Sequence, residues 1–321
     1  MLELDTLSEI INDALRGIEY PERPEGLYQP IAYILDCGGK RLRPVLTLAT
    51  CQALCGNSGK ALNQAMAMEM FHNFTLLHDD VMDKADLRRG RPTVHRKWDE
   101  ATAILSGDAL LTLATQRVTM NAGEYLHDVM TLFNKTAMEV YEGQQYDMDF
   151  EQQDDVTIEQ YVEMIRLKTS VLLGAACDMG AIMGGASAEV RKAMYTFGEK
   201  LGLAFQLQDD YLDTYGDALI FGKEIGGDIV NNKRTWLLVT ALSKDSSGKL
   251  HRFIDHCPVS NAEKIATVME IYNDNDIPRL CTEAIKGYVD EAVAAVKTAG
   301  LSPSDEKFFI DLALSTIGRT H

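Results

Sequence analysis

The feature that most constrains this chain is a pair of acidic motifs with the same spacing, each following an apolar stretch. The first motif, DDVMD, holds Asp79, Asp80 and Asp83, and the second, DDYLD, holds Asp209, Asp210 and Asp213. The first and third aspartates of each motif are four residues apart, so on a helix they share one face. Like charges at this spacing destabilise a helix by roughly 0.2–0.5 kcal/mol. The repeated motif therefore predicts two helix faces that bind cations.

Magnesium is the cation that suits such motifs. It takes oxygen ligands, keeps several waters and is commonly shared between carboxylates and substrate phosphates. Arg88 and Arg89 follow the first motif directly, and guanidinium groups match phosphate oxygens in geometry. One such motif alone is also compatible with a solvated acidic helix end before a basic loop. Two copies favour two acidic walls that hold several magnesium ions and a diphosphate.

Further segments carry a family resemblance. They are GGKRLRP at 38–44, RRGRPTVH at 88–95, GQQYD at 143–147, KTS at 168–170 and FGKEIGGDIVNNKRTWL at 221–237. With both aspartate motifs, these segments resemble the trans-isoprenyl diphosphate synthases, which make farnesyl, geranylgeranyl and longer polyprenyl diphosphates. They stand in the family's order over most of the chain.

Apolar periodicity predicts helices nearly everywhere and few strands. The expected helices include residues 4–16, 44–55, 60–79, 101–120, 124–148 and 157–184. No internal boundary is evident, so residues 1–321 are expected to form a single domain. Together with the resemblance, this predicts an all-α fold: one large helical bundle of the isoprenoid synthase type with a central active-site cavity.

The resemblance assigns one group of residues to isopentenyl diphosphate. The group consists of Lys40, Arg43, His72 and Arg89. Without the resemblance, the basic turn at 38–44 is compatible with a surface turn, and a lone histidine in a helix is more often a satisfied core residue. Arg41, in the same turn, is not assigned by the motif.

A second group is assigned to the allylic diphosphate and to catalysis. The residues assigned to the allylic diphosphate are Arg88, Lys168, Thr169, Gln206, Lys223 and Lys233. The residues assigned to catalysis are Asp79, Asp80, Asp83, Arg88, Lys168, Thr169, Gln206, Asp209, Asp210 and Lys223. The family implies three magnesium ions held by the six motif aspartates. Gln144 and Asp147 are expected to orient the residues that contact the metal and the substrates.

Two phenylalanines are candidates for control of product length. Phe74 and Phe71 lie five and eight residues before Asp79, where a growing prenyl tail would descend. In the family, an aromatic residue five before the motif accompanies short products. Phe74 occupies that position and Thr75 beside it is small, so a C15 or C20 product is expected and the choice between them stays open.

The amino-acid composition excludes some classes of binding partner. The net charge of −17 argues against nucleic-acid binding and against docking on anionic lipid. No stretch approaches the ~18 apolar residues of a membrane span, and the acidic N-terminus lacks a signal-peptide core. The six scattered cysteines form no zinc set and predict reduced thiols in a cytoplasmic protein. The family is usually homodimeric, which makes helical faces around 101–148 a candidate interface.

These observations predict a short-chain prenyltransferase that condenses isopentenyl diphosphate with dimethylallyl, geranyl or farnesyl diphosphate. The reaction proceeds by ionisation, condensation and elimination and gives farnesyl or geranylgeranyl diphosphate plus pyrophosphate. A class I terpene cyclase is one alternative, but its second metal motif is normally a mixed Asn/Ser/Glu type. A non-catalytic partner subunit is another, but such subunits usually have eroded motifs.

Overall fold

The computed structural model describes residues 3–216, 225–246, 248–255 and 259–317. They group into two compact units: Met1–Asn134 with Ala175–Met194 (unit 1), and Lys135–Gly174 with Tyr195–His321 (unit 2). Helices dominate both units, and the strands in the described part are β1 (Leu87–Arg88) and β2 (Arg91–Pro92). The predicted all-α class is therefore confirmed. Among the described residues, no helix is long and apolar enough to span a membrane.

Unit 1 is built from the N-terminal helices. They are α1 (Leu4–Arg16), α2 (Glu25–Asp36), α3 (Leu42–Cys55), η1 (Ser58–Ala61), α4 (Leu62–Met82), α5 (Val94–Lys97), α6 (Glu100–Thr119) and η2 (Gly123–Tyr125). Helix α1 shows how the sequence directs this packing: Leu7, Ile11 and Leu15 recur every four residues and all three are buried. That spacing puts them on one face, which packs into the core of the unit.

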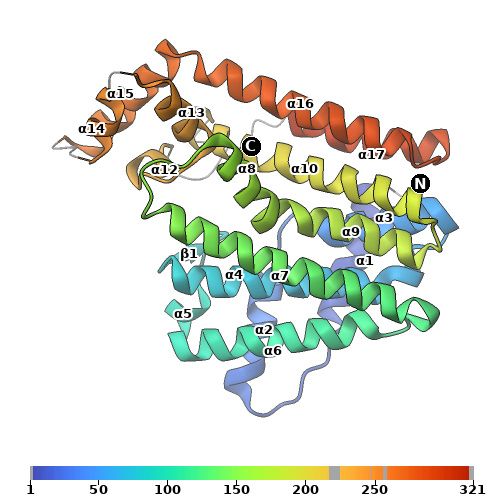
Figure 1. The fold of residues 1–321 in the computed structure, drawn as a ribbon. Coiled ribbons are helices and arrows are strands. Elements are labelled where there is room, and N and C mark those ends of the chain that lie inside the picture. The colour runs from blue at the N-terminus through green and yellow to red at the C-terminus, as the bar shows by residue number, and fades with distance from the viewer. Residues whose placement is uncertain (1–2, 217–224, 247, 256–258, 318–321) are drawn as a thin grey trace. The chain divides into compact units, whose positions relative to one another are not determined.

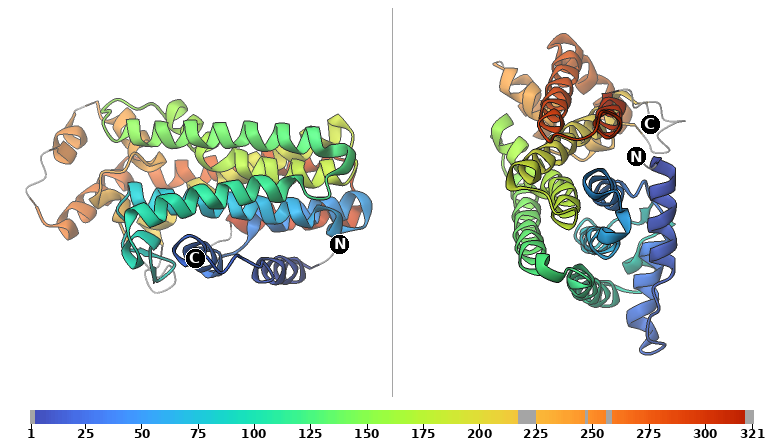
Figure 2. Two further views of the ribbon diagram at one scale, coloured as in Figure 1. Left: turned by 90° about the horizontal axis from the view of Figure 1, so that it is seen from below. Right: turned by 90° about the vertical axis from the view of Figure 1, so that its right-hand side faces the viewer.

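The pair formed by α4 and α6 positions the first aspartate motif. The two helices run alongside each other (Figure 1), and further views show the same pairing (Figure 2). Gly107 of α6 permits this approach, because a Cβ there would lie 2.2 Å from Nε2 of His78 on α4. His78 Nε2 lies 3.0 Å from the carbonyl oxygen of Ile104. The helix turn just before Asp79 is therefore fixed against α6.

Unit 2 contains the C-terminal helices. They are α8 (Ile158–Ile165), η3 (Arg166–Ser170), α12 (Gly227–Val230), α13 (Trp236–Lys244), α14 (Lys249–Asp255), α15 (Asn261–Asp274), α16 (Ile277–Lys297) and α17 (Pro303–Ile317). The boundaries between the units fall within α7 (Leu126–Phe150), α9 (Val171–Met183) and α10 (Ala188–Tyr215). Helix α16 packs beside α17 (Figure 1), and the ring of Phe309 on α17 stacks edge-on against Phe197 of α10 at 5.3 Å.

The helix predicted over 157–184 is present, but it contains a π-helical turn. Helix α8 begins at a capping box made by Thr157 and Gln160, and the chain then winds into a π-helical turn, η3, before α9. Two glycines in unit 2 pack against this turn. A Cβ on Gly143 would lie 2.2 Å from the Lys168 nitrogen, and one on Gly202 would lie 2.7 Å from the Ser170 Cα. The turn carries the KTS segment, and π-bulges of this kind frequently occur at functional sites.

Candidate active site

The first aspartate motif ends α4 and is held by an arginine. Nε and Nη2 of Arg88 lie 2.8 and 2.7 Å from the same oxygen, Oδ1 of Asp80, and Nη2 lies 3.6 Å from Oδ2 of Asp79. Asp80 is 1% exposed, and this burial raises its pKa while the Arg88 hydrogen bond opposes the rise. Because a guanidinium donates and never accepts, the contact favours the ionised carboxylate.

The other oxygen of Asp80 is unusual for the interior. Oδ2 is buried and has no hydrogen-bond partner among the described residues. Leaving a charged acceptor unsatisfied costs more than the roughly 1–3 kcal/mol typical of a neutral group. An oxygen in this state is suited to accept a ligand from outside the chain.

A two-residue hairpin turn places the arginines that follow the motif. Strands β1 and β2 pair Arg88 with Arg91, and Arg89 and Gly90 between them have φ values of 53° and 74°. Two successive positive φ values are typical of the tight turn that matches the twist of a hairpin. A non-glycine residue in this region is strained, and such strain clusters at functional sites. The turn directs Arg88 to the aspartates and leaves Arg89 at the tip.

Arg89 contacts the glycine turn that precedes α3. Its Nη1 donates to the carbonyl oxygen of Gly38, and a Cβ on Gly39 would lie 2.7 Å from its Cζ. Gly38 and Gly39 have φ values of 75° and 124°, a backbone that L side chains rarely adopt. The glycines therefore let the guanidinium approach the backbone closely.

His72 and Arg43 form a second contact of the predicted isopentenyl diphosphate group. Nη1 of Arg43 lies 3.2 Å from Nε2 of His72. Burial lowers the pKa of His72 well below its usual range, and Arg43, Arg89, Arg88 and Arg41 lower it further. Arg43 is only a donor, so the imidazole is neutral, accepts through Nε2 and carries its proton on Nδ1. It can thus offer one N–H to a phosphate oxygen.

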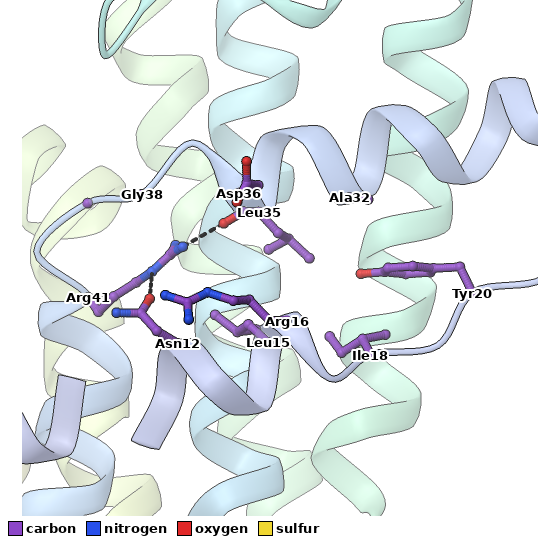
Figure 3. Close-up of a pocket in the computed structure, with 11 residues that line it drawn as sticks. Asn12, Leu15, Arg16, Ile18, Tyr20, Ala32, Leu35, Asp36, Gly38 and Arg41 are labelled. Carbon is purple, nitrogen blue, oxygen red and sulfur yellow. Dashed lines mark hydrogen bonds between the residues drawn. The ribbon is translucent and has the colours of Figure 1, made fainter. Parts of the chain in front are cut away.

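Arg41 has a structural role. Its Nη1 lies 2.6 Å from Oε1 of Glu69, its Nη2 donates to the carbonyl oxygen of Leu35 and its Nε donates to Asn12 (Figure 3). It is 6% exposed, with all three contacts inside unit 1. These contacts hold Arg41 within unit 1, and the motif assigns it no substrate.

The second aspartate motif lies inside α10 and is held by neutral donors. Tyr161 of α8 donates its hydroxyl to Oδ2 of Asp210, and the backbone N–H of Trp236 lies 3.2 Å from the same oxygen. Nε2 of Gln206, one turn earlier, lies 3.2 Å from Oδ1. Burial raises the pKa of Asp210 to about 7, with Tyr161 as the main opposing contact. No arginine contacts this carboxylate among the described residues.

The third aspartate of this motif contributes to local structure. Oδ2 of Asp213 accepts the backbone N–H of Asp228 at 2.9 Å, and its carbonyl oxygen accepts the N–H of Gly226 at 2.7 Å. These bonds tie the short helix α12 to α10. Asp209 is half-buried on α10 one position before Asp210.

The π-helical turn connects the KTS segment to the second motif. Thr169 Oγ1 lies 3.3 Å from Oε1 of Gln206, which in turn contacts Asp210. Nζ of Lys168 lies 2.5 Å from Oδ2 of Asp147 on α7. A relay from Thr169 through Gln206 to Asp210 therefore exists in unit 2, and Asp147 orients the lysine.

The predicted site residues thus fall into two groups, one in each unit. Unit 1 holds Lys40, Arg43, His72, Asp79, Asp80, Asp83, Arg88 and Arg89, and unit 2 holds Lys168, Thr169, Gln206, Asp209, Asp210, Asp213 and Lys233. Lys223 lies outside the described residues. The phenylalanines Phe71 and Phe74 are buried in unit 1 with ring centroids 5.6 Å apart.

The donor set fits a divalent cation shared with a ligand. Within the described ranges, no three His, Cys, Asp or Glu side chains converge into a ready-made metal cage. Oδ2 of Asp80, which is buried and contacts no donor among the residues described, is nevertheless the type of hard oxygen that magnesium prefers. One or two carboxylates completed by phosphate oxygens and waters are the usual magnesium arrangement, and this motif suits it.

Sequence reasoning missed two groups that hold Asp210. Tyr161 lies 49 residues from Asp210 along the chain, and Trp236 acts through its backbone N–H. A lone tyrosine in an amphipathic helix carries no motif, and a backbone donor is invisible in sequence. Only the fold brings them to the carboxylate.

The chain is similar to known proteins over most of its length. Residues 24–274 match the polyprenyl synthetase family. A geranylgeranyl diphosphate synthase of Methanosarcina mazei is 41% identical to this chain over 75% of each chain. A short chain isoprenyl diphosphate synthase of Methanothermobacter thermautotrophicus is 38% identical over 83% of this chain and 82% of its own length. A crystal structure of a geranylgeranyl pyrophosphate synthase, 42% identical, covers 100% of both chains with a TM-score of 0.95. The chain belongs to the polyprenyl synthetase family and is a prenyltransferase of the short-chain isoprenyl diphosphate synthase class.

Proposed function

We propose that this chain condenses isopentenyl diphosphate with dimethylallyl, geranyl or farnesyl diphosphate and releases pyrophosphate. The product is farnesyl or geranylgeranyl diphosphate. The observation that carries the proposal is the buried first motif, in which Arg88 occupies one oxygen of Asp80 and the other has no partner in the described part of the chain. A guanidinium beside an open carboxylate oxygen suits a diphosphate bound together with a cation.

Magnesium is the proposed cofactor, with three ions on the family resemblance. Asp79, Asp80 and Asp83 would hold it in unit 1, and Asp209, Asp210 and Asp213 in unit 2. When bound, it would neutralise the diphosphate and stabilise the charge of the leaving group. The open oxygen of Asp80 supports this assignment.

Basic and neutral polar side chains of the chain bind the two substrates. Lys40, Arg43, His72 and Arg89 hold isopentenyl diphosphate, with His72 donating through Nδ1. Arg88, Lys168, Thr169, Gln206, Lys223 and Lys233 serve the allylic diphosphate. Arg88 and Lys168 stabilise the negative charge that develops as the C–O bond breaks, which lowers the barrier to the allylic cation.

The condensation and elimination steps require that water is excluded from the site, and they do not require a protein base. The double bond of isopentenyl diphosphate attacks the allylic cation and forms the new carbon–carbon bond. Loss of one proton, with the departing pyrophosphate as acceptor, regenerates an allylic diphosphate five carbons longer. Water would quench the cation to an alcohol, so a closed site is required.

Several further features are proposed on the same basis. The whole chain acts as one catalytic domain in the cytoplasm and forms a homodimer. Ile104 and Leu105 on α6, 47% and 60% exposed, support an interface within 101–148. Exposed apolar patches mark interaction surfaces.

The decisive experiment is product analysis of the purified chain alone. Magnesium and isopentenyl diphosphate are supplied with dimethylallyl, geranyl or farnesyl diphosphate in turn. Products that end at C15 or C20 are expected. Release of pyrophosphate with a hydrocarbon product would indicate a cyclase instead, and absence of turnover until a partner is added would indicate a regulatory subunit.

Phe74 is proposed as the floor that ends chain growth. Its ring packs against Phe71 at 5.6 Å and against His78 at 4.8 Å. Phe74→Ala should open space below the motif and lengthen the product by at least one five-carbon unit. Phe133→Ala is the matched control, because Phe133 contacts Phe71 at 5.5 Å and is equally internal. An unchanged product distribution in Phe74→Ala would place the floor elsewhere.

A further inference from the structure

A cavity of about 390 Å³ lies in unit 1 between α1, α2 and the glycine turn before α3. None of the residues assigned to the two diphosphates lines it. Its volume lies within the range of roughly 300–1,000 Å³ that is typical of small-molecule sites, at the lower end. The cavity therefore has room for a compact ligand.

The walls of this cavity are apolar on two sides. Figure 3 shows Leu15 and Ile18 on the α1 side and Leu35 and Ala32 on α2, with the Tyr20 ring at one end. The hydroxyl oxygen of Tyr20 is buried and has no hydrogen-bond partner among the described residues. This part of the cavity suits a hydrocarbon chain.

The opposite end of the cavity carries hydrogen-bond donors. Asn12 uses its Oδ1 to accept from Arg41, which leaves the amide N–H groups of its side chain as donors (Figure 3). Arg41 is neutralised by Glu69, and Asp36 at the rim pairs with Arg91 at 3.2 Å. The N–H donors at this end suit a ligand that carries a hydrogen-bond acceptor.

Arg16 supplies the charge at this end. Its guanidinium pairs with Asp13 at 3.2 Å, but the two side chains are 71% and 76% exposed. Such an exposed pair contributes only about 0–1 kcal/mol, so Arg16 can exchange Asp13 for another anion at little cost. In Figure 3 the Arg16 side chain lies toward Asn12 and Arg41.

We propose that this cavity is a regulatory site for a small amphipathic carboxylate. The carboxylate pairs with Arg16 and Asn12, and the chain lies along Leu15, Ile18 and Leu35 toward the Tyr20 ring. Gly38 and Gly39 line the cavity and also contact the guanidinium of Arg89. A ligand bound against that turn holds Arg89 on the Gly38 carbonyl, away from isopentenyl diphosphate. This last consequence rests on the proposed function.

Binding is tested first, without turnover, by calorimetric titration of the intact chain with decanoate below its micellar concentration. Ile18→Trp fills the cavity and should abolish binding, whereas Arg16→Gln should weaken it about ten-fold through loss of a charged hydrogen bond. Tyr20→Phe is the matched control and should bind as the wild type does. Decyltrimethylammonium, with the same chain and opposite charge, should not bind. Equal binding of decanoate by the wild type, Ile18→Trp and Arg16→Gln, or no binding at all, would overturn the site.

Regulation is tested by the KM for isopentenyl diphosphate. Saturating decanoate should raise it about five-fold in the wild type, a typical coupling between sites, and leave it unchanged in Ile18→Trp. Equal melting temperatures of the two chains verify that the tryptophan is tolerated. A KM that decanoate leaves unchanged in the wild type would overturn the coupling. Absence of prenyl transfer in every chain, with binding intact, would contradict the proposed function and not the site.

Discussion

The two aspartate motifs have the same spacing but different surroundings. In the first, an arginine binds one oxygen of Asp80 and the other oxygen has no partner within the described ranges. In the second, both oxygens of Asp210 accept from neutral donors, and its pKa is raised to about 7. One sequence pattern therefore occurs in two surroundings: a carboxylate paired with a guanidinium, and a carboxyl group that contacts neutral donors and has its pKa raised to about 7.

The largest expected effect is the loss of turnover when either motif loses its first carboxylate. Asp79→Ala and Asp209→Ala should each lower kcat by about a thousand-fold, the scale of a lost electrostatic contact to a developing charge. Folding should change little, because both residues are partly exposed. Steady-state kinetics with circular dichroism measures both quantities. Asp86→Asn, an exposed acid that pairs with Arg96, is the control; near-normal rates in either motif variant would refute the magnesium assignment.

Removing the partner of the buried aspartate should destabilise the fold more at the first motif than at the second. Arg88→Met leaves the buried charge of Asp80 without its cation and should lower the free energy of unfolding by about 3–5 kcal/mol. Tyr161→Phe removes one of three neutral donors to Asp210 and should cost about 1–2 kcal/mol. Denaturant titration gives both values. Arg96→Met, at an exposed ion pair, should cost less than about 1 kcal/mol, and equal losses at Arg88 and Tyr161 would remove the contrast.

The raised pKa of Asp210 should make the free energy of unfolding depend on pH. An aspartate in an unfolded chain titrates near pH 4, and the folded Asp210 titrates at about 7. Between these values the folded state binds more protons, so the contribution of Asp210 to stability is present at low pH and is lost as the pH rises from about 4 to 7. In metal-free buffer, the unfolding free energy of the wild type relative to Asp210→Asn should therefore fall over this window. A flat or rising difference would contradict the raised pKa.

Much of the fold was predictable because helical periodicity is a local property. The spacing of Leu7, Ile11 and Leu15 predicts α1 with its observed bounds, Leu4–Arg16. The π-helical turn at Arg166–Ser170 was not predictable, because it depends on close packing of Gly143 and Gly202, which are distant in sequence. Periodicity therefore identified the helices but not the irregular turn between two of them.

Some contacts among the motif residues were predictable from the sequence, but the raised pKa of Asp210 was not. The motifs identify the aspartates and arginines, and Arg88 does contact Asp80. The state of Asp210 depends on Tyr161 and on the backbone of Trp236, neither of which a motif marks. Sequence patterns thus indicate which residue types take part, whereas tertiary contacts determine their pKa values.

The most direct test of the difference between the motifs is the number of protons released when magnesium binds. Calorimetric titration at pH 6, in buffers of different ionisation enthalpy and with an unreactive allylic diphosphate analogue present, counts these protons. The wild type should release about one proton more than Asp210→Asn, because Asp210 must ionise to bind the cation. Equal proton release by the wild type and Asp210→Asn would contradict the claim that the second motif starts protonated.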